Sequence, residues 1–538
     1  MRQIHSSAWL LVGLSALLQI LVFPLPDFYF LSWFAFAPLI VALLRARPAG
    51  ALEIDGSTNL RAATPGQAFL LAYTCGILWY AGTCYWIFDT MRAYGGLNSA
   101  MALLALILFC LYLGLYHGLF GLLVGLATGP DRDNRRSLIS IPFFWVAAEL
   151  ARTRITGFPW DLLGTAQVDN ISLSRISTWT GVYGLSFEIM LVNVALAAAF
   201  LVHRKKRSTL LLAALAAAVV LQAGRLVDAP AVPPDRVALL VQQNIPVDEN
   251  WTRETFEHTL QQLTDLTVRT NGAGFLPTDS KSGDKPDLIV WPESPAPFFT
   301  SDPLFRRPVS EMAKDTGTWV VTGAIGNNPR KDRAASEVFN SAALISPAGD
   351  WTARYDKVHL VPFGEYLPFP KLFAFAGGLT KEVGQFKAGE SRAPLRAGDE
   401  PLGVFICYES VFPDEVRQFA KDGAQVFVNI SNDGWYGDSG AYAQHLNQTR
   451  MRAIENDRWL LSATDTGVTA SIDPYGRVVV RLPRKVRDAL AAPYALNSRT
   501  TFYTRHGDWF AFLCAIISVG VLLTRFIPLH KDTRKESA

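Results

Sequence analysis

The sequence predicts a polytopic α-helical membrane domain with eight transmembrane helices, joined to an extracytoplasmic α/β domain. Half of the 538 residues are hydrophobic and the mean hydropathy is positive, which is unusual for a soluble protein of this length. Long apolar stretches recur through residues 1–224 and again near the C-terminus. Between them, the polar residues 225–505 alternate short strand-like runs with helical stretches.

Eight apolar stretches approach the roughly 20 residues that a helix needs to cross a bilayer's hydrocarbon core. Seven precede the polar segment and one follows it: Ala8–Phe23, Phe28–Leu44, Ala68–Phe88, Ala100–Ala127, Leu138–Leu150, Tyr183–Val202, Thr209–Ala223 and Trp509–Thr524. The first has the position of a secretory signal peptide but lacks a small-x-small cleavage site, so we predict a retained span. The fifth is the weakest, because it is short and carries Glu149 near its end.

Basic residues predict the orientation, because positively charged loops stay on the cytoplasmic side of a membrane. They gather in alternate connections, at Arg2, Arg45, Arg47, Arg61, Arg132, Arg135, Arg136, Arg204–Arg207, Arg525, Lys531, Arg534 and Lys535. This alternation requires all eight stretches to span. Both termini are then cytoplasmic, and the polar segment lies on the outer face.

We therefore divide the chain into a membrane domain (1–224), a catalytic domain (225–505) and a last span with a cytoplasmic tail (506–538). The Pro-rich stretch Asp228–Pro234 leads out of the seventh span. Strands are predicted at Val237–Val241, Asp287–Trp291, Trp319–Thr322, Ala342–Ile345, Val404–Ile406, Gln425–Ile430 and Trp459–Ala463, and helices at Thr252–Thr270 and Ala441–Asn456.

Three of the predicted strands end in residues that can do chemistry. Cys407 follows the run 404–406 and precedes a polar turn, which is how a fold presents a nucleophile at a strand edge. Glu293 follows another strand, where partial burial would suit a carboxylate for general-base work. Lys357 precedes apolar residues and a turn, and a lysine there can donate to a developing oxyanion.

Each of the three also has a purely structural interpretation. A free cysteine is commonly buried and inert, Glu293 can be a helix cap or surface carboxylate, and Lys357 can be a solvated lysine at a strand end. Glu, Lys and Cys at three strand ends, in that order, are far more specific together than singly. The other cysteines lie inside apolar stretches, so no disulfide framework and no CxxC metal site is predicted: Cys75, Cys84, Cys110 and Cys514.

The constellation resembles the nitrilase superfamily of carbon-nitrogen hydrolases and, within it, the apolipoprotein N-acyltransferase family of bacterial membrane enzymes. The resemblance covers essentially the whole chain, except for insertions at 49–65 and 272–286. Its motifs are G-F-P-W at Gly157–Trp160, V-Q-Q-N-I-P at Val241–Pro246, W-P-E ending at Glu293, Lys357–Glu365, C-Y-E at Cys407–Glu409 and N-I-S-N-D-G-W-Y-G at Asn429–Gly437. It implies a nitrilase-like α-β-β-α sandwich with a triad of Glu293, Lys357 and Cys407. The supporting, substrate-binding residues would be Trp251, Glu365, Tyr408 and Glu409.

The resemblance also implies the reaction. An acyl chain would pass from the sn-1 position of a phospholipid, through a thioester on Cys407, to the α-amine of S-diacylglyceryl-cysteine on an apolipoprotein. Glu293 would take the thiol proton, while Lys357 and a backbone N–H near Tyr408 would stabilise the oxyanion. We expect a monomer in the bacterial inner membrane, with a periplasmic catalytic domain and no metal or other cofactor. The net charge of +3 implies no nucleic-acid partner.

The segment Tyr366–Leu379 is too broken by Pro and Gly to span a membrane and is rich in aromatic residues. We predict a lid that dips into the membrane interface, where aromatic side chains settle readily. An ordinary loop over a small separate core fits the pattern equally well.

Other functional classes remain to be weighed. A membrane-tethered nitrilase-like amidase acting on small amides would share the triad, but it needs one anchor and not eight spans. A serine lipase needs a Gly-x-Ser-x-Gly elbow, which is absent, and no histidine has an Asp five residues later, as a His-based acyltransferase requires. A transporter stays open, although the predicted spans carry few ionisable residues, chiefly Glu149 and Glu188.

Overall fold

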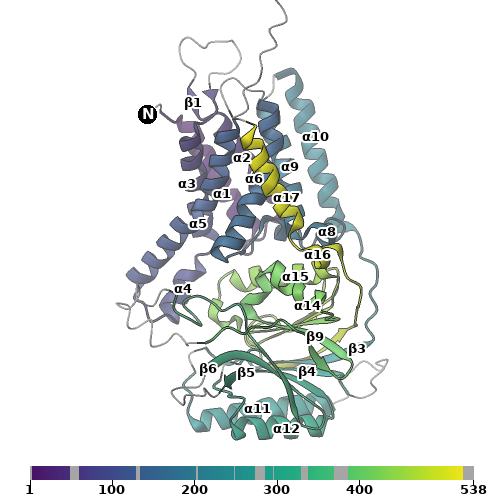
Figure 1. The fold of residues 1–538 in the computed structure, drawn as a ribbon. Coiled ribbons are helices and arrows are strands. Elements are labelled where there is room, and N and C mark those ends of the chain that lie inside the picture. Colours follow the sequence, from purple (N-terminus) through teal and green to yellow (C-terminus); the bar gives the residue numbers. More distant parts are fainter. Residues whose placement is uncertain are drawn as a thin grey trace, which may run out of the picture.

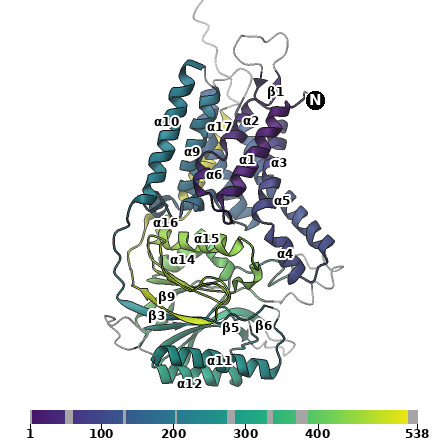
Figure 2. The ribbon, with the colours of Figure 1, turned by 180° about the vertical axis from the view of Figure 1, so that it is seen from behind.

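A helical bundle and an α/β domain are stacked end to end in the computed structural model (Figure 1). It describes residues 3–48, 60–128, 134–201, 204–247, 249–272, 285–294, 296–328, 337–368 and 386–524. The last helix returns to the bundle after the chain has passed through the α/β domain, so the bundle holds both early and late parts of the sequence (Figures 1 and 2).

The bundle has helical structure at all eight apolar stretches. Its helices are α1 (Ser6–Val22), α2 (Ala37–Leu44), α3 (Pro65–Thr83), α4 (Trp86–Ala93), α5 (Ser99–Ala127), α6 (Asn134–Ala151), α9 (Val182–Leu201), α10 (Arg204–Gln222) and α17 (Trp509–Leu523). In the described part of the chain, three helices are long and apolar enough to cross a membrane: α5, α9 and the helix Lys206–Leu226, which includes most of α10. The number rises to four if α3 and α4 form one bent span. The chain therefore has a membrane domain.

Two stretches predicted as continuous helices are broken. Ala68–Phe88 bends by 52° between α3 and α4, and residues 29–33 form a 3₁₀ turn before α2. Each break has polar partners that satisfy freed backbone groups. The Oδ1 atom of Asn193 accepts from the N–H groups of Phe36 and Ala37, while the carbonyl of Thr83 accepts from the Gln444 amide.

Helices α3 and α5 approach closely because α5 presents glycines to α3. A Cβ atom at Gly121 would lie 2.3 Å from the carbonyl oxygen of Ala68, and one at Gly125 would lie 2.8 Å from the Cβ of Ala68. Small residues at a helix contact allow such backbone approach within a membrane. The start of α3 is fixed by a capping box between Thr64 and Gln67.

The α/β domain is a sandwich of two six-stranded sheets with helices on both outer faces, as predicted (Figures 1 and 2). One sheet has the order β14-β3-β4-β5-β6-β7 and the other β13-β12-β11-β10-β9-β8. Their bounds are β3 (Arg236–Gln242), β4 (Leu288–Val290), β5 (Trp319–Asn328), β6 (Glu337–Ile345), β7 (Trp351–Asp356), β8 (Leu395–Ala397), β9 (Glu400–Ile406), β10 (Val426–Ser431), β11 (Leu460–Thr464), β12 (Ala470–Ile472), β13 (Val478–Arg481) and β14 (Asp488–Tyr494).

The central strands of both sheets are parallel: β3, β4 and β5 in one, and β9, β10 and β11 in the other. Along β3, Leu239 and Val241 face the core beneath the outer helices, whereas Ala238 and Leu240 join the larger core between the sheets. All seven predicted strand runs lie in these sheets. Burial on both faces explains their continuous apolar sequence.

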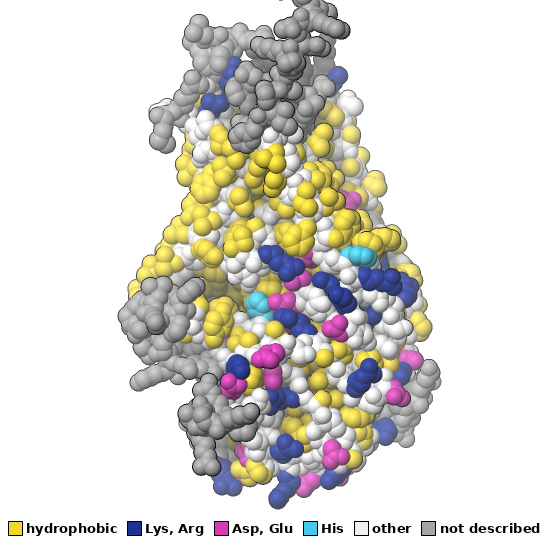
Figure 3. All heavy atoms as spheres, in the orientation of Figure 1, with side chains coloured by type: hydrophobic (Ala, Val, Ile, Leu, Met, Phe, Trp, Pro, Cys, Tyr) yellow, Lys and Arg dark blue, Asp and Glu magenta, His cyan; other side chains and the backbone are white. Residues whose placement is uncertain are grey.

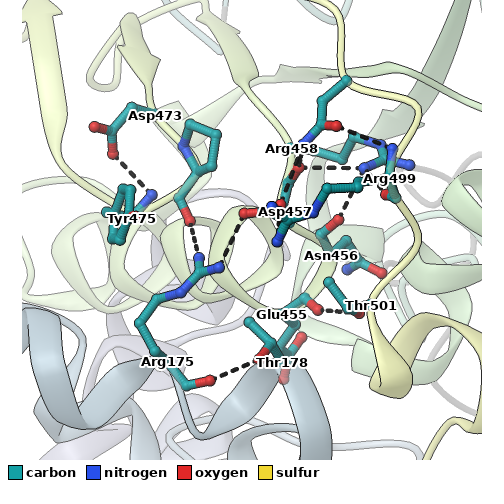
Figure 4. Close-up of polar contacts among 12 residues, drawn as sticks. Arg175, Thr178, Glu455, Asn456, Asp457, Arg458, Asp473, Tyr475, Arg499 and Thr501 are labelled. Carbon is teal, nitrogen blue, oxygen red and sulfur yellow. Dashed lines mark hydrogen bonds and ion pairs between the residues drawn. The ribbon is translucent and has the colours of Figure 1, made fainter. Parts of the chain in front are cut away.

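Helices α11 (Arg253–Gly272) and α12 (Pro303–Thr316) cover the outer sheet, while α14 (Pro413–Lys421) and α15 (Ala441–Asn456) lie between the other sheet and the bundle (Figure 1). The C-terminal end of α15 makes polar contacts with the membrane domain. The carboxylate of Glu455 accepts from the N–H of Val182, the first residue of α9, a favourable place for negative charge. Figure 4 shows the Arg175 guanidinium directed at Asp457, 3.0 Å away.

A second ionic contact joins three distant segments. Arg154, in the turn after α6, pairs with Asp414 of α14 and with Asp508, which precedes α17. The Asp508 side chain is fully buried and also accepts from the Tyr503 hydroxyl at 2.9 Å. The bundle, the α/β domain and the last helix therefore meet at one arginine.

We expect Arg154→Met to destabilise the protein by about 1–3 kcal/mol, because Asp508 would stay buried without its cation. Thermal denaturation in detergent measures the effect. Arg269→Met is the matched control, since Arg269 and its partner Asp265 are exposed on α11 and such pairs contribute little. Equal melting temperatures for both variants would contradict a structural role for the Arg154 contact.

Candidate active site

Cys407 lies directly after β9, as the first residue of a 3₁₀ turn that runs to Val411. Its φ is +50°, a left-handed conformation that is costly for a residue with a side chain. Burial raises the pKa of the Cys407 thiol, the carboxylate of Glu293 raises it further, and the ammonium of Lys357 opposes both. The resting thiol is therefore protonated at neutral pH and needs a base to react.

Lys357 follows β7 and is buried, with its side chain 1% exposed. Its Nζ donates to Oε1 of Glu365 at 3.0 Å and lies 3.6 Å from Oε1 of Glu293. Burial lowers the pKa of Lys357, but the charges of Glu365 and Glu293 outweigh burial and raise it overall. The lysine therefore remains an ammonium ion between two carboxylates.

Glu293, three residues beyond the end of β4, is held from two sides. Its Oε1 accepts from the Asn340 amide at 2.6 Å, and its Oε2 accepts from the backbone N–H of Asn432 at 2.8 Å. The same Asn340 amide donates to Oε1 of Glu365 at 2.6 Å. Asn340 thus links the two carboxylates that flank Lys357. Sequence reasoning missed it, although an asparagine inside a strand is uncommon and marks the position.

Glu409 connects the lysine loop to the cysteine turn. Its Oε2 accepts from the N–H of Ile406, and its Oε1 accepts from the N–H groups of Val358 and His359 and from the Tyr355 hydroxyl. Burial raises its pKa, and these hydrogen bonds oppose that shift. The contacts fix where Lys357 and Cys407 lie relative to each other.

Tyr408 faces the membrane domain. Its hydroxyl donates to the carbonyl of Gly157 at 3.2 Å, and its ring stacks on Trp160 at a centroid distance of 6.4 Å. The Nε1 of Trp160 donates in turn to Gln444 of α15. The G-F-P-W motif of the membrane domain therefore forms one wall beside the cysteine turn.

The structure brings together six of the seven predicted site residues. The seventh, Trp251, lies half-buried against the core beneath α11 and α12, and its supporting role stays a prediction. The predicted lid at 366–379 falls mostly on residues 369–379, which lie outside the described residues. Within the described chain, no group of three His, Cys, Asp or Glu residues is arranged to hold a metal ion.

Residues 15–195 match the apolipoprotein N-acyltransferase N-terminal domain family, and residues 236–501 match the carbon-nitrogen hydrolase family. An apolipoprotein N-acyltransferase from Geobacter metallireducens is 35% identical, over 94% of this chain and 93% of that relative. Another from Methylococcus capsulatus is also 35% identical, over 91% of this chain and 94% of the relative. The chain belongs to the apolipoprotein N-acyltransferase family.

Solved structures that resemble part of this chain are less similar in sequence. A nitrilase-superfamily amidase from Nesterenkonia is 19% identical with a TM-score of 0.37, over 53% of this chain and 99% of the amidase. Nit3 of Saccharomyces cerevisiae, a member of branch 10 of that superfamily, is 15% identical with a TM-score of 0.36, over 57% of this chain and all of Nit3.

We expect Asn340→Asp to slow acylation of the cysteine by about 10²-fold, because it replaces the bridging donor with a third carboxylate and displaces Glu293. The rate of adduct formation, followed by intact-mass spectrometry, measures this. Asn327→Asp makes the same chemical change at an exposed amide that donates to Ser301 and should leave the rate unchanged. Equal rates in both variants would exclude a role for the Asn340 bridge.

Proposed function

We propose that this chain transfers an acyl chain from the sn-1 position of a phospholipid to the N-terminal α-amine of S-diacylglyceryl-cysteine on apolipoproteins, completing lipoprotein maturation. Glu293, Lys357 and Cys407 form the triad of this proposal. The observation that carries it is the Lys357 ammonium, buried between Glu293 and Glu365 beside a cysteine turn that contacts the membrane domain.

In the first half-reaction, Glu293 takes the proton from the Cys407 thiol, and the thiolate attacks the ester carbonyl carbon of the phospholipid. Lys357 and a backbone N–H near Tyr408 stabilise the resulting oxyanion. As the intermediate collapses, the ester C–O bond breaks, and the departing lysophospholipid alkoxide takes the proton from Glu293. A thioester remains on Cys407.

In the second half-reaction, the α-amine of the acceptor attacks the thioester carbonyl carbon. The amine proton passes to Glu293, and the C–S bond breaks to release the Cys407 thiolate, which recovers that proton. Lys357 stabilises the oxyanion that forms in each half-reaction. The two substrates bind one after the other, which predicts ping-pong kinetics.

The wall beside Cys407 favours a lipid donor over a small amide. Tyr408 packs on Phe158 and Trp160, both contributed by the membrane domain, so the reacting carbonyl would enter along apolar surface continuous with the bundle. A small soluble amide has no acyl chain that could make apolar contacts with these aromatic side chains. The proposed donor is therefore one held in the bilayer.

We further propose that the bundle spans the inner membrane eight times, with both termini cytoplasmic and the catalytic domain periplasmic. On the face shown in Figure 3, apolar side chains predominate on the bundle, whereas charged side chains gather on the α/β domain. The exposed apolar residues include Leu212, Val219 and Val220 of α10 and Ile516 and Val519 of α17. Such a surface suits contact with lipid.

Reporter fusions test this topology. A reporter that is active only outside the cytoplasm should work when fused after Asp228 and fail when fused after Lys206 or Ala538, because the positive-inside rule keeps the basic ends in the cytoplasm. The inverse pattern would overturn the proposed orientation.

A covalent adduct tests the reaction itself. Incubated with phospholipid, the parent enzyme should gain the mass of one acyl chain at Cys407, and Cys407→Ser should gain none, because a hydroxyl is far harder to ionise than a thiol. Cys110→Ser, a buried thiol of α5, is the control and should keep the adduct. Acyl transfer by Cys407→Ser at the parent rate would exclude the covalent mechanism. An adduct formed only from small amides would favour an amidase.

The pH profile of Glu293→Gln tests the assignment of the base. Loss of the base should slow acylation at neutral pH by about 10²–10⁴-fold. Loss of its charge also lowers the Cys407 pKa, so the rate should recover as pH rises and thiolate forms unaided. Glu311→Gln, an exposed change on α12, serves as control. A loss that is constant from pH 7 to pH 10 would contradict the role of base.

A further inference from the structure

His445 lies in the first half of α15 and is buried, with 3% of its side chain exposed. The triad does not use it, yet its Nε2 lies 3.2 Å from the carbonyl oxygen of Cys407 and 2.8 Å from the hydroxyl of Ser410. Both atoms belong to the 3₁₀ turn that starts at the nucleophile. The imidazole therefore contacts the turn from the side of the membrane-facing helix.

The opposite ring nitrogen, Nδ1, lies 3.2 Å from Oδ1 of Asp433. That oxygen is held by the Ser431 hydroxyl at 2.7 Å. A carbonyl only accepts hydrogen bonds, so the ring contacts the Cys407 carbonyl as a donor from Nε2. Among the described residues, Asp433 and Tyr436, the latter at a ring-centroid distance of 5.7 Å, are the titratable side chains in contact with the ring.

The His445 ring is also positioned by stacking, in addition to the contacts of its two nitrogens. His445 stacks on Trp160 with an interplanar angle of 5° and a centroid distance of 6.2 Å. One residue earlier, the amide of Gln444 donates to the carbonyls of Pro24 and Thr83 at the ends of α1 and α3, and accepts from Trp160. The position of the imidazole is thus set by the membrane domain.

We infer that His445 is a positioning residue for Cys407: held by Asp433 and Trp160, it binds the carbonyl of the left-handed nucleophile and keeps the turn in its reactive conformation. Cys407 has φ +50°, and a residue held in this region persists only where its surroundings enforce it. The inference rests on the proposed role of Cys407 as the nucleophile. It assigns His445 no proton transfer to or from the substrate.

Two substitutions separate positioning by hydrogen bonding from simple packing. His445→Gln keeps a donor for the Cys407 carbonyl but loses the ring, whereas His445→Phe keeps the stacked ring but loses both ring nitrogens. Misplacement of a reacting group by about 1 Å costs roughly 10²-fold in rate. We therefore expect an acylation rate about 10²-fold below the parent for the Phe variant and about tenfold below for the Gln variant. The KM for phospholipid should stay unchanged in both.

The experiment uses the full-length enzyme in detergent and measures two rates by intact mass: acylation by phospholipid, and alkylation of Cys407 by iodoacetamide. Alkylation needs no lipid, so its ranking of the variants stands even if the proposed acyl donor is wrong. Gln448→Met is the control, because Gln448 is buried on the same helix and its amide donates only within that helix, to Gln444.

A Phe variant slower than the Gln variant in both rates, with the Gln448 variant at the parent rate, supports the inference. A Phe variant as fast as the Gln variant or faster would overturn it, since packing of the ring would then be all that matters. If either variant unfolds, Asp433→Asn replaces it: the inference expects a slower alkylation rate there, and the parent rate would overturn it.

Discussion

The buried ammonium of Lys357 is the charge around which the proposed catalytic site is arranged. A cation removed from water is costly unless carboxylates and further hydrogen bonds surround it, and here Glu293 and Glu365 provide the charges. Two carboxylates near one lysine leave an excess negative charge. The Asn340 amide and the N–H of Asn432 offset it by donating to those carboxylates. Burial and the charge of Glu293 together raise the pKa of the neighbouring Cys407 thiol and keep it protonated.

Local sequence pattern was enough for much of the fold. Strands buried on both faces have unbroken apolar sequences. The Glu, Lys and Cys that follow three of these strands can be recognised without a structure. The eight apolar stretches likewise coincide with helical structure.

Other features depend on contacts that no local pattern carries. Strands β12, β13 and β14 pair antiparallel toward the edges. The first two have only three and four residues, and β14 contains Pro493, which is uncommon in a strand. The break between α3 and α4 is held by Gln444, which is 361 residues away from Thr83 in the chain. Asn340 and His445 lie within a regular strand and a regular helix, so only their spatial neighbours reveal what they do.

The position of Asp508 has a consequence for biogenesis. Its partner Arg154 follows α6, and its other neighbour in the contact, Asp414, lies in the catalytic domain, so the three arrive at very different times during synthesis. Arg154 and Asp414 leave the ribosome first and wait for the C-terminal helix to insert. This contact is then completed only when translation is almost finished, and a chain truncated before Asp508 would keep the Arg154–Asp414 pair and the contacts of α15 but lack the second, buried partner of Arg154.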